Sequence, residues 1–370
     1  MAGPAICVIV PVYNVAPFLD QCLDSVRAQT WRDLEILCVN DGSTDGSRDL
    51  LAAHAAADPR LRVIDQANAG YGAAMNAGLA AARGEYVAIV ESDDFLDAGT
   101  LRWLLGVART HDADVVKANY YHHWSAPVPR DELVRVVGAA EAGRVLTDPV
   151  GQSDILYQPP SIWSALYRRG FLEAADARFL PTPGASYQDA SFAFKVWANA
   201  PRTYLLREAF LHYRQDNAAS SIHSLGKVTA VMAEFDEMAR YLTSRPGLPA
   251  RLEAARQLMR YNAYLWNYDR LDDGLRGEFL EAVARQFRDE AASGTLDLSA
   301  FDPLRATNVR AIMASPARFH AAKAAARGHR VATALSYGRL GGPRLALDLA
   351  ADRLRRRSYP RYPADRAERP

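Results

Sequence analysis

The first 120 residues alternate between short apolar runs and longer segments in which apolar side chains repeat with helical spacing. This alternation limits the possible folds more than any other feature of the chain. The apolar runs lie at residues 5–12, 34–39, 61–65, 86–90 and 114–118. The helical patterns lie between them, at about 16–29, 46–57, 71–82 and 98–110. Continuous apolar runs suit strands that are covered on both faces. The pattern therefore predicts an α/β domain with right-handed crossovers and a mostly parallel sheet.

The second half of the chain changes character. The pattern weakens between residues 121 and 150, where PVPRDE at 127–132 is interpreted as a loop. Further along, the sequence predicts a short strand and a helix over 161–175, a helix over 188–199 and a strand over 203–214. After about residue 225, strand patterns stop and helical patterns rich in Ala, Arg and Leu follow one another. We expect an α/β domain over 1–225 and an all-helical region over 226–370.

Composition excludes several classes of protein. The formal net charge of +1 on 370 residues gives no overall attraction to nucleic acid, so no nucleic-acid partner is expected. The three cysteines lack metal-ligand spacing, and Cys7 and Cys38 lie inside apolar runs, which is typical of a reducing compartment. No apolar stretch approaches the roughly 18–20 residues that span a bilayer. The N-terminus lacks the basic region of a signal peptide. We expect a cytoplasmic location.

Small, polar and acidic residues follow the predicted strands. Ligands of open α/β sheets bind outside the carboxyl ends of the strands. The residues at those ends are 11–14 (PVYN), 40–45 (NDGSTD), 68–72 (NAGYG) and 91–94 (ESDD). The chain has no GxxxxGK[ST] loop, and no GxGxxG follows the first strand.

The acids at 91–94 predict a divalent cation if a phosphate binds nearby. A phosphate charge ~4 Å from a bare carboxylate is repelled by about 1–4 kcal/mol. A hard cation such as Mg²⁺ or Mn²⁺ binds both groups and removes that repulsion. The alternative is that Ser92, Asp93 and Asp94 only cap the following helix. The two roles are compatible.

Three blocks of sequence resemble a known family. They are VIVPVYNVAPFLDQCLDSVRAQTWRDLEILCVNDGSTDGS, NAGYGAAMNAGLAAARGEYVAIVESDD and YQDASFAFKVW. Over roughly residues 5–225 the chain resembles family-2 glycosyltransferases of the GT-A fold. The resemblance implies an inverting transfer from a nucleotide-diphosphate sugar, usually a UDP-sugar. The acceptor would be a hydroxyl of a saccharide, a glycolipid or other lipid-linked molecule, or a wall polymer, in bacterial cell-surface polysaccharide synthesis.

The resemblance also implies roles for individual residues. By position, the donor-binding residues are Pro11, Tyr13 and Asp41 at the base, Asn68 and Gly70 near the nucleotide, and Asn76 near the sugar or phosphates. In Glu91-Ser92-Asp93, which occupies the acidic metal motif, Asp93 is the expected ligand of Mn²⁺ or Mg²⁺. Glu91 is a second candidate ligand, and Glu91 or Ser92 is expected to contact the ribose. Two departures stand out: Glu91 replaces the usual Asp, and Met75 stands where many relatives carry Arg.

Asp189 is the expected catalytic base. Relatives often carry two adjacent acids at this point, of which the second is the base; here Gln188 replaces the first. An inverting transfer needs one base to deprotonate the acceptor hydroxyl, and no general acid where a metal stabilises UDP. The alternative role for Asp189 is to cap its own helix.

Five further side chains are weaker candidates. Arg214 could contact the diphosphate. His212 and His223 could complete the metal shell, although a lone histidine is more often structural. Trp163 and Tyr167 could stack on an acceptor sugar or belong to the core.

The helical region raises two other possibilities. The stripe of Tyr261, Tyr264, Leu265, Trp266 and Tyr268 predicts helix–helix packing, and could instead pair two chains. The basic segment 345–363 could lie on the inner face of the cell membrane, or be a solvated terminal helix.

Two other functions remain open from the sequence. They are a nucleotidyltransferase that forms sugar nucleotides and a catalytically silent nucleotide-sugar-binding scaffold.

Overall fold

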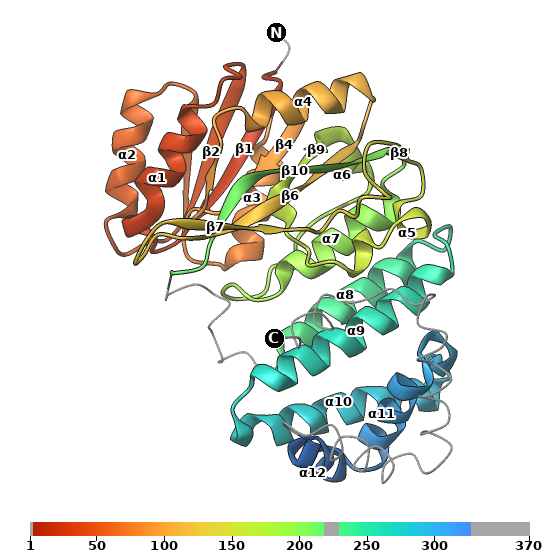
Figure 1. Ribbon diagram of the computed structural model, residues 1–370. Coiled ribbons are helices and arrows are strands. Elements are labelled where there is room, and N and C mark those ends of the chain that lie inside the picture. The colour runs from red at the N-terminus through yellow and green to blue at the C-terminus, as the bar shows by residue number, and fades with distance from the viewer. Residues whose placement is uncertain (1–2, 218–228, 327–370) are drawn as a thin grey trace. The chain divides into compact units, whose positions relative to one another are not determined.

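The computed structural model describes residues 3–217 and 229–326 (Figure 1). The chain divides into two compact units, Met1–His223 and Ser224–Pro370. The first holds a mixed sheet flanked by helices, and the described part of the second is helical. The predicted α/β class is therefore confirmed.

Four parallel strands form the N-terminal half of the sheet, in the order β3-β2-β1-β4. They are β1 (Ile6–Val12), β2 (Leu34–Asp41), β3 (Leu61–Gln66) and β4 (Tyr86–Ile89). The helices between and after them are α1 (Ala16–Arg27), α2 (Ser47–Ala57), α3 (Tyr71–Ala81) and α4 (Thr100–Thr110). All eight elements lie where the apolar patterns predict them.

Both faces of these strands are covered, as their continuous apolar character requires. Val8 and Val10 of β1 belong to one buried cluster with Leu19 and Leu23 of α1. Ile9 points to the other face and meets α3. A Cβ on Gly78 would lie 2.6 Å from Ile9 Cγ2, so only glycine lets α3 approach this closely.

Beyond β4 the sheet is mixed, which corrects the expectation of a mostly parallel sheet. β9 (Ala165–Arg168) is antiparallel to both of its neighbours, β4 and β6 (Val115–Trp124). β10 (Thr203–Arg214) is parallel to β6, and β5 (Phe95–Leu96) pairs antiparallel with β10. Periodicity predicts that a segment is a strand but carries no information on its direction, so this reversal was not predictable.

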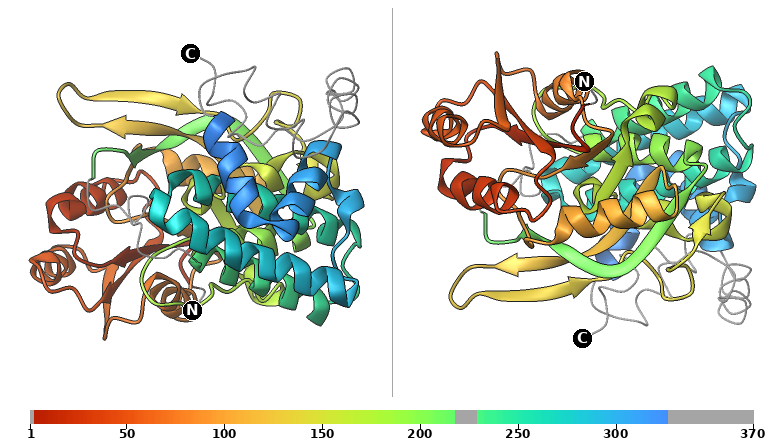
Figure 2. Two further views of the ribbon diagram at one scale, coloured as in Figure 1. Left: turned by 90° about the horizontal axis from the view of Figure 1, so that it is seen from below. Right: turned by 90° about the horizontal axis from the view of Figure 1, so that it is seen from above.

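The predicted loop at 127–132 is partly wrong. β7 (Arg130–Val134) pairs antiparallel with β6 and extends it as a hairpin, visible in yellow in Figure 2. A second short strand, β8 (Val145–Leu146), pairs with β10. The remaining helical elements of this unit are α5 (Pro149–Gln152), the 3-10 turns Ile155–Tyr157 and Ile162–Ser164, α6 (Arg169–Ala174) and α7 (Gln188–Asn199).

Residues 229–326 contain only helices, as predicted for this region. They are α8 (Ala230–Ser244), α9 (Arg251–Arg270), α10 (Asp273–Ser293), the 3-10 turn Leu298–Ala300, α11 (Pro303–Ala314) and α12 (Pro316–Ala326). Tyr264 of α9 is buried and contacts Phe235, Phe279 and Phe287 on neighbouring helices. The tyrosines of the aromatic stripe therefore pack between helices, whereas Trp266 is exposed.

The described helices include none that is both long and apolar enough to cross a membrane. The basic segment 345–363 and His223 lie outside the described residues.

Candidate active site

Asp41 joins the ends of two neighbouring strands. Its Oδ1 accepts hydrogen bonds from the Gln66 side chain (2.7 Å) and the Ala69 amide (2.9 Å), and its Oδ2 accepts one from the Gly70 amide (2.9 Å). A carboxylate has about four lone-pair sites, so a further donor can still bind. The predicted contact between Asp41 and the base of the nucleotide fits this geometry and stays a prediction.

Tyr13 and Asp41 leave the sheet side by side, because the residues before them are paired in the β1–β2 ladder. Pro11 is buried within β1, whereas 52% of Tyr13 is exposed. Asn68, in the loop after β3, is exposed too. A ring and an amide that both face solvent beside a buried carboxylate suit the recognition of a flat heterocycle.

The loop after β3 touches the segment that leads into α7. Gly70 has φ of +90°, and a Cβ there would lie 2.6 Å from both Gly184 N and Thr182 O. The Tyr71 amide donates to Gly184 O (2.9 Å). This backbone contact requires glycine at position 70. It brings the N-terminus of α3 close to the segment that carries Asp189.

Four carboxyl groups act on one another near the end of β4. Glu91 Oε1 accepts a hydrogen bond from the Tyr71 hydroxyl (2.6 Å). Burial raises the pKa of Glu91 to about 8; the Tyr71 bond opposes the rise, and the charges of Asp93 and Asp189 add to it. Burial and the Asp93 charge hold the pKa of Asp94 well above its usual range. The acids of the β4 end and Asp189 thus share one electrostatic environment.

Asp189 lies in the first turn of α7, and its pKa is raised to about 6. Burial causes the rise and outweighs the amides of Asp189 and Ala190, which favour the ionised form. The N-cap residue is Tyr187. Asp189 is therefore not the cap of its helix, and its carboxylate is poised to exchange a proton near neutral pH.

Gln188 fastens the loop before α7. Its amide nitrogen donates to Thr182 Oγ1 (2.9 Å) and to Gly184 O (3.1 Å). Its Oε1 accepts a hydrogen bond from the Ser186 amide (2.5 Å). Because this side chain is buried and neutral, it holds the loop without adding a further negative charge beside Asp189.

Arg214 holds the turn of Glu91 to Asp94 through two hydrogen bonds. Its Nε donates to Asp93 O (2.8 Å), and its backbone amide donates to Asp94 Oδ1 (2.9 Å). Its Nη atoms donate to Gln21 and to the Ser125 hydroxyl. The side chain is buried, so the observed role is to position Asp93. The predicted contact with a diphosphate stays a prediction.

Asn76 also has a structural contact. Its Nδ2 donates to Phe179 O (2.8 Å), and its Oδ1 accepts from the Phe179 amide (2.9 Å). The pair fixes the start of the segment that leads to Asp189, and a sugar or phosphate contact stays a prediction. Met75 is completely buried, so it belongs to the core.

The aromatic candidates separate into core and site. Tyr167 is buried and donates to Ile162 O (2.7 Å), so it belongs to the core. Trp163 is partly buried and stacks on Tyr213 (ring centroids 4.9 Å apart). Burial raises the pKa of Tyr213, and the acids of the β4 end and Asp189 raise it further. Trp163 and Tyr213 therefore border the acidic site. Sequence reasoning missed Tyr213.

His212 belongs to a separate group. It pairs with Asp131 and Asp97 and stacks on Phe95.

The donor set at the β4 end fits a hard divalent cation. Carboxylate oxygens of Glu91 and Asp93 are the ligand type that Mg²⁺ and Mn²⁺ prefer. Asn217 donates to Asp93 Oδ2 (2.8 Å), whereas no described residue donates to Asp93 Oδ1. The buried Oδ2 of Asp94 also has no hydrogen-bond partner among the described residues. A cation would relieve this concentration of like charge.

The sequence of residues 7–144 matches the family described as "Glycosyl transferase family 2". Residues 7–144 form a family 2 glycosyltransferase domain. Among curated relatives, the chain is 34% identical over 218 residues to the uncharacterized glycosyltransferase EpsJ of Bacillus subtilis, covering 58% of this chain and 62% of EpsJ. It is 32% identical over 231 residues to the uncharacterized glycosyltransferase YibD of Escherichia coli, covering 59% of this chain and 64% of YibD. The match thus spans less than two thirds of these relatives.

Solved structures of glycosyltransferases share the fold of this chain. Residues 1–349 of Staphylococcus aureus TarS, in complex with UDP-GlcNAc, match with a TM-score of 0.69 at 18% identity, covering 86% of this chain and 89% of that one. The mannosyltransferase PcManGT of Pyrobaculum calidifontis, in complex with GDP-Man and Mn²⁺, matches with a TM-score of 0.52 at 18% identity, over 95% of this chain and 87% of that one. The GT-A fold expected from the sequence is confirmed.

Proposed function

We propose that the chain is an inverting glycosyltransferase that moves a sugar from a UDP-sugar to an acceptor hydroxyl. The observation that carries the proposal is the shared electrostatic environment of Glu91, Asp93 and Asp189, which supports a site that combines a carboxylate pair of the metal-binding type with a base of raised pKa. The relatives named as glycosyltransferases and the bound UDP-GlcNAc of TarS support the same reaction class.

In the proposed reaction, the Asp189 carboxylate removes the proton from the acceptor hydroxyl. The freed oxygen attacks the anomeric carbon on the face opposite the diphosphate, a new glycosidic bond forms, and the bond to UDP breaks. The configuration at that carbon is inverted. Trp163 and Tyr213 border the site, where their ring faces could support an acceptor sugar.

Asp93 and Glu91 would hold the divalent cation, which when bound neutralises the charge that develops on the departing UDP. Arg214 and Asn217 fix the Asp93 backbone and carboxylate from two sides. Such bracing matters because a residue that ligates a metal needs a defined orientation before the metal binds. The bound Mn²⁺ of PcManGT supports a metal-dependent site.

The test separates donor binding from turnover. A panel of nucleotide sugars is screened by thermal unfolding with and without Mn²⁺, and a donor present at 100 times its Kd should stabilise the protein by about 2.7 kcal/mol. Asp93→Ala should lose the Mn²⁺-dependent stabilisation. Asp189→Asn should keep it and lose turnover by about 10²–10⁴-fold. Normal turnover in Asp189→Asn would exclude Asp189 as the base.

The same experiment tests the two other functions. A scaffold would bind a donor without transferring or hydrolysing it in the wild-type protein. A nucleotidyltransferase would form sugar nucleotide from a nucleoside triphosphate, yet the residues that follow β1 (13–18, YNVAPF) include no Lys or Arg for a triphosphate. The acceptor class, the inner-membrane contact and pairing of two chains stay proposals that this screen does not address.

A further inference from the structure

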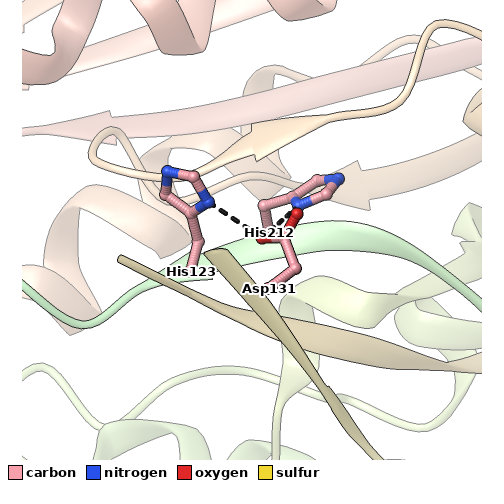
Figure 3. Close-up of side chains that lie close together, drawn as sticks. All are labelled: His123, Asp131 and His212. Atoms are coloured by element: carbon pink, nitrogen blue, oxygen red, sulfur yellow. Dashed lines mark hydrogen bonds and ion pairs between the residues drawn. The ribbon is translucent and has the colours of Figure 1, made fainter. Parts of the chain in front are cut away.

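Two histidines and an aspartate meet on the side of the sheet that His212 faces. Figure 3 shows the rings of His123 and His212 turned toward Asp131. The Nδ1 atoms of His123 and His212 lie 2.8 Å and 3.0 Å from the same atom, Asp131 Oδ1. The three ligand atoms lie within 4.8 Å of one another. They come from three strands, β6, β7 and β10.

The outer nitrogen of each ring is held by a second partner. His212 Nε2 lies 3.2 Å from Asp97 Oδ1, and His123 Nε2 lies 3.2 Å from the Ser125 hydroxyl. Histidines that bind metals usually donate their second ring N–H to a carboxylate, carbonyl or water, which fixes the ring and its tautomer. His212 has that arrangement with the Asp97 carboxylate, and the His123 ring is held by the Ser125 hydroxyl in the same way; the opposite nitrogen of each ring is aimed at one point.

A count of donors calls for a positive charge at that point, which either a doubly protonated His212 or a bound cation supplies. A carboxylate only accepts hydrogen bonds, and a neutral imidazole has one N–H. His212 nevertheless lies between two carboxylates, those of Asp97 and Asp131. If Nδ1 binds a metal, a neutral His212 satisfies both contacts, because Nε2–H donates to Asp97. One divalent cation also balances the two carboxylate charges.

We propose that His123, Asp131 and His212 form a binding site for a divalent transition-metal ion of the Zn²⁺ class, distinct from the site at Asp93. Two ligands about 2.0–2.1 Å from one ion are separated by about 3.0–3.4 Å, close to the two contacts that Asp131 makes. Imidazole nitrogens favour Zn²⁺, Cu²⁺ or Ni²⁺ over Mg²⁺. Asp131 is exposed, which leaves an open coordination position for water.

The ion would fasten the β6–β7 hairpin to β10. β7 pairs only with β6 among the described strands, so it lacks a second neighbour in the sheet. Asp131 is the residue through which β7 reaches His212 of β10. Metal–ligand bonds that join three strands would therefore stabilise the hairpin most.

The test uses full-length Asp93→Ala protein, so that the predicted catalytic metal does not contribute. After removal of metal by a chelator, Zn²⁺ is titrated by calorimetry and Co²⁺ by its visible absorption. We expect one equivalent of each, with no competition from Mg²⁺. Binding of no Co²⁺ or Zn²⁺ by this protein would overturn the proposal without any further variant.

Three variants in the same background locate the ion. Asp131→Asn should weaken Zn²⁺ binding by about 100-fold or more, and Asp97→Ala, which removes only an outer partner, by about 10–100-fold. His122→Gln is the matched control, because His122 is the next residue on β6 and contacts Tyr213 on the opposite face. Equal affinity in Asp131→Asn and His122→Gln would refute the site. Unfolding temperatures without metal establish that each variant is folded.

Discussion

Asp189 combines burial with a position in the first turn of a helix, and the two act against each other. Helix amides favour the carboxylate, yet burial is the larger influence and raises its pKa to about 6. An exposed Asp with a pKa near 3.9 would be a weaker base at neutral pH. Burial at this position therefore destabilises the ionised form and makes the carboxylate a stronger base, as is common at catalytic sites.

The raised pKa of Asp189 predicts the pH dependence of turnover. The base must be ionised, so kcat/KM should fall as the pH drops through about 6, and be near one tenth of its plateau at pH 5. The measurement is initial rate against pH with the metal held constant. Donor affinity, followed by calorimetry over the same range, is the control. A constant kcat/KM between pH 5 and pH 7 would contradict the assignment of Asp189.

The same raised pKa has a consequence for stability. An Asp whose folded pKa exceeds its unfolded value binds more protons when folded, so its contribution is fully present at low pH and is lost as the pH rises from about 4 to about 6. Asp189→Asn should therefore be at least as stable as the wild-type protein at pH 7. Loss of turnover in that variant then reports on chemistry and not on folding.

The segment before α7 is placed by a contact that crosses the sequence. Asn76 of α3 uses both of its polar groups on the backbone of Phe179, 103 residues away. We expect Asn76→Ala to lower the free energy of unfolding by about 1–3 kcal/mol, because it leaves backbone groups of Phe179 without their partners. It should also lower kcat, because Asp189 follows that segment.

Denaturant unfolding and steady-state kinetics measure the two effects of Asn76→Ala. Asn68→Ala is a suitable comparison, since Asn68 is exposed and should change donor binding more than stability. A variant at Asn76 with unchanged stability but weakened donor binding would favour the original prediction that Asn76 contacts the sugar or phosphates.

The elements that the sequence predicts well are those with a strong apolar period. α7 and β10 have the same bounds in the sequence pattern and in the structure, because their apolar spacing begins and ends sharply. β7 was missed because its exposed Arg-Asp-Glu residues follow two prolines, and a charged edge strand is defined by its partner and not by its own pattern. The direction of β9 was missed because the apolar period of a strand carries no information on its direction.

Site residues that depend on local pattern were also predicted better than those that depend on contacts between distant segments. Acids at the strand ends, such as Asp41 and Asp93, were predicted because parallel strands share one edge. Contacts between distant segments were not predictable: Asp131 and His212 are 81 residues apart, and neither belongs to a motif. The bracing role of Arg214 likewise depends on how β10 pairs with its neighbours.

At the level of the whole chain, the family 2 domain match ends at residue 144, whereas Asp189 and Arg214 lie beyond it. The proposed site therefore needs the first compact unit up to about residue 225. The helical region has a core of its own, with the buried Arg260 paired to Glu290 and aromatic rings around Tyr264. We propose that donor binding is confined to residues 1–225.

Hydrogen exchange tests that boundary. With UDP and Mn²⁺ at about 100 times their Kd, amides that exchange only after the ligand leaves should slow by about 100-fold, since the bound state gains about 2.7 kcal/mol. We expect this at the loop around Gly70 and the turn of Glu91 to Asp94, and no change in α9 and α10. Asp93→Ala should show no slowing in either unit. Comparable slowing in α9 or α10 of the wild-type protein would mean that the helical region takes part in donor binding, and that residue 225 is not the functional boundary.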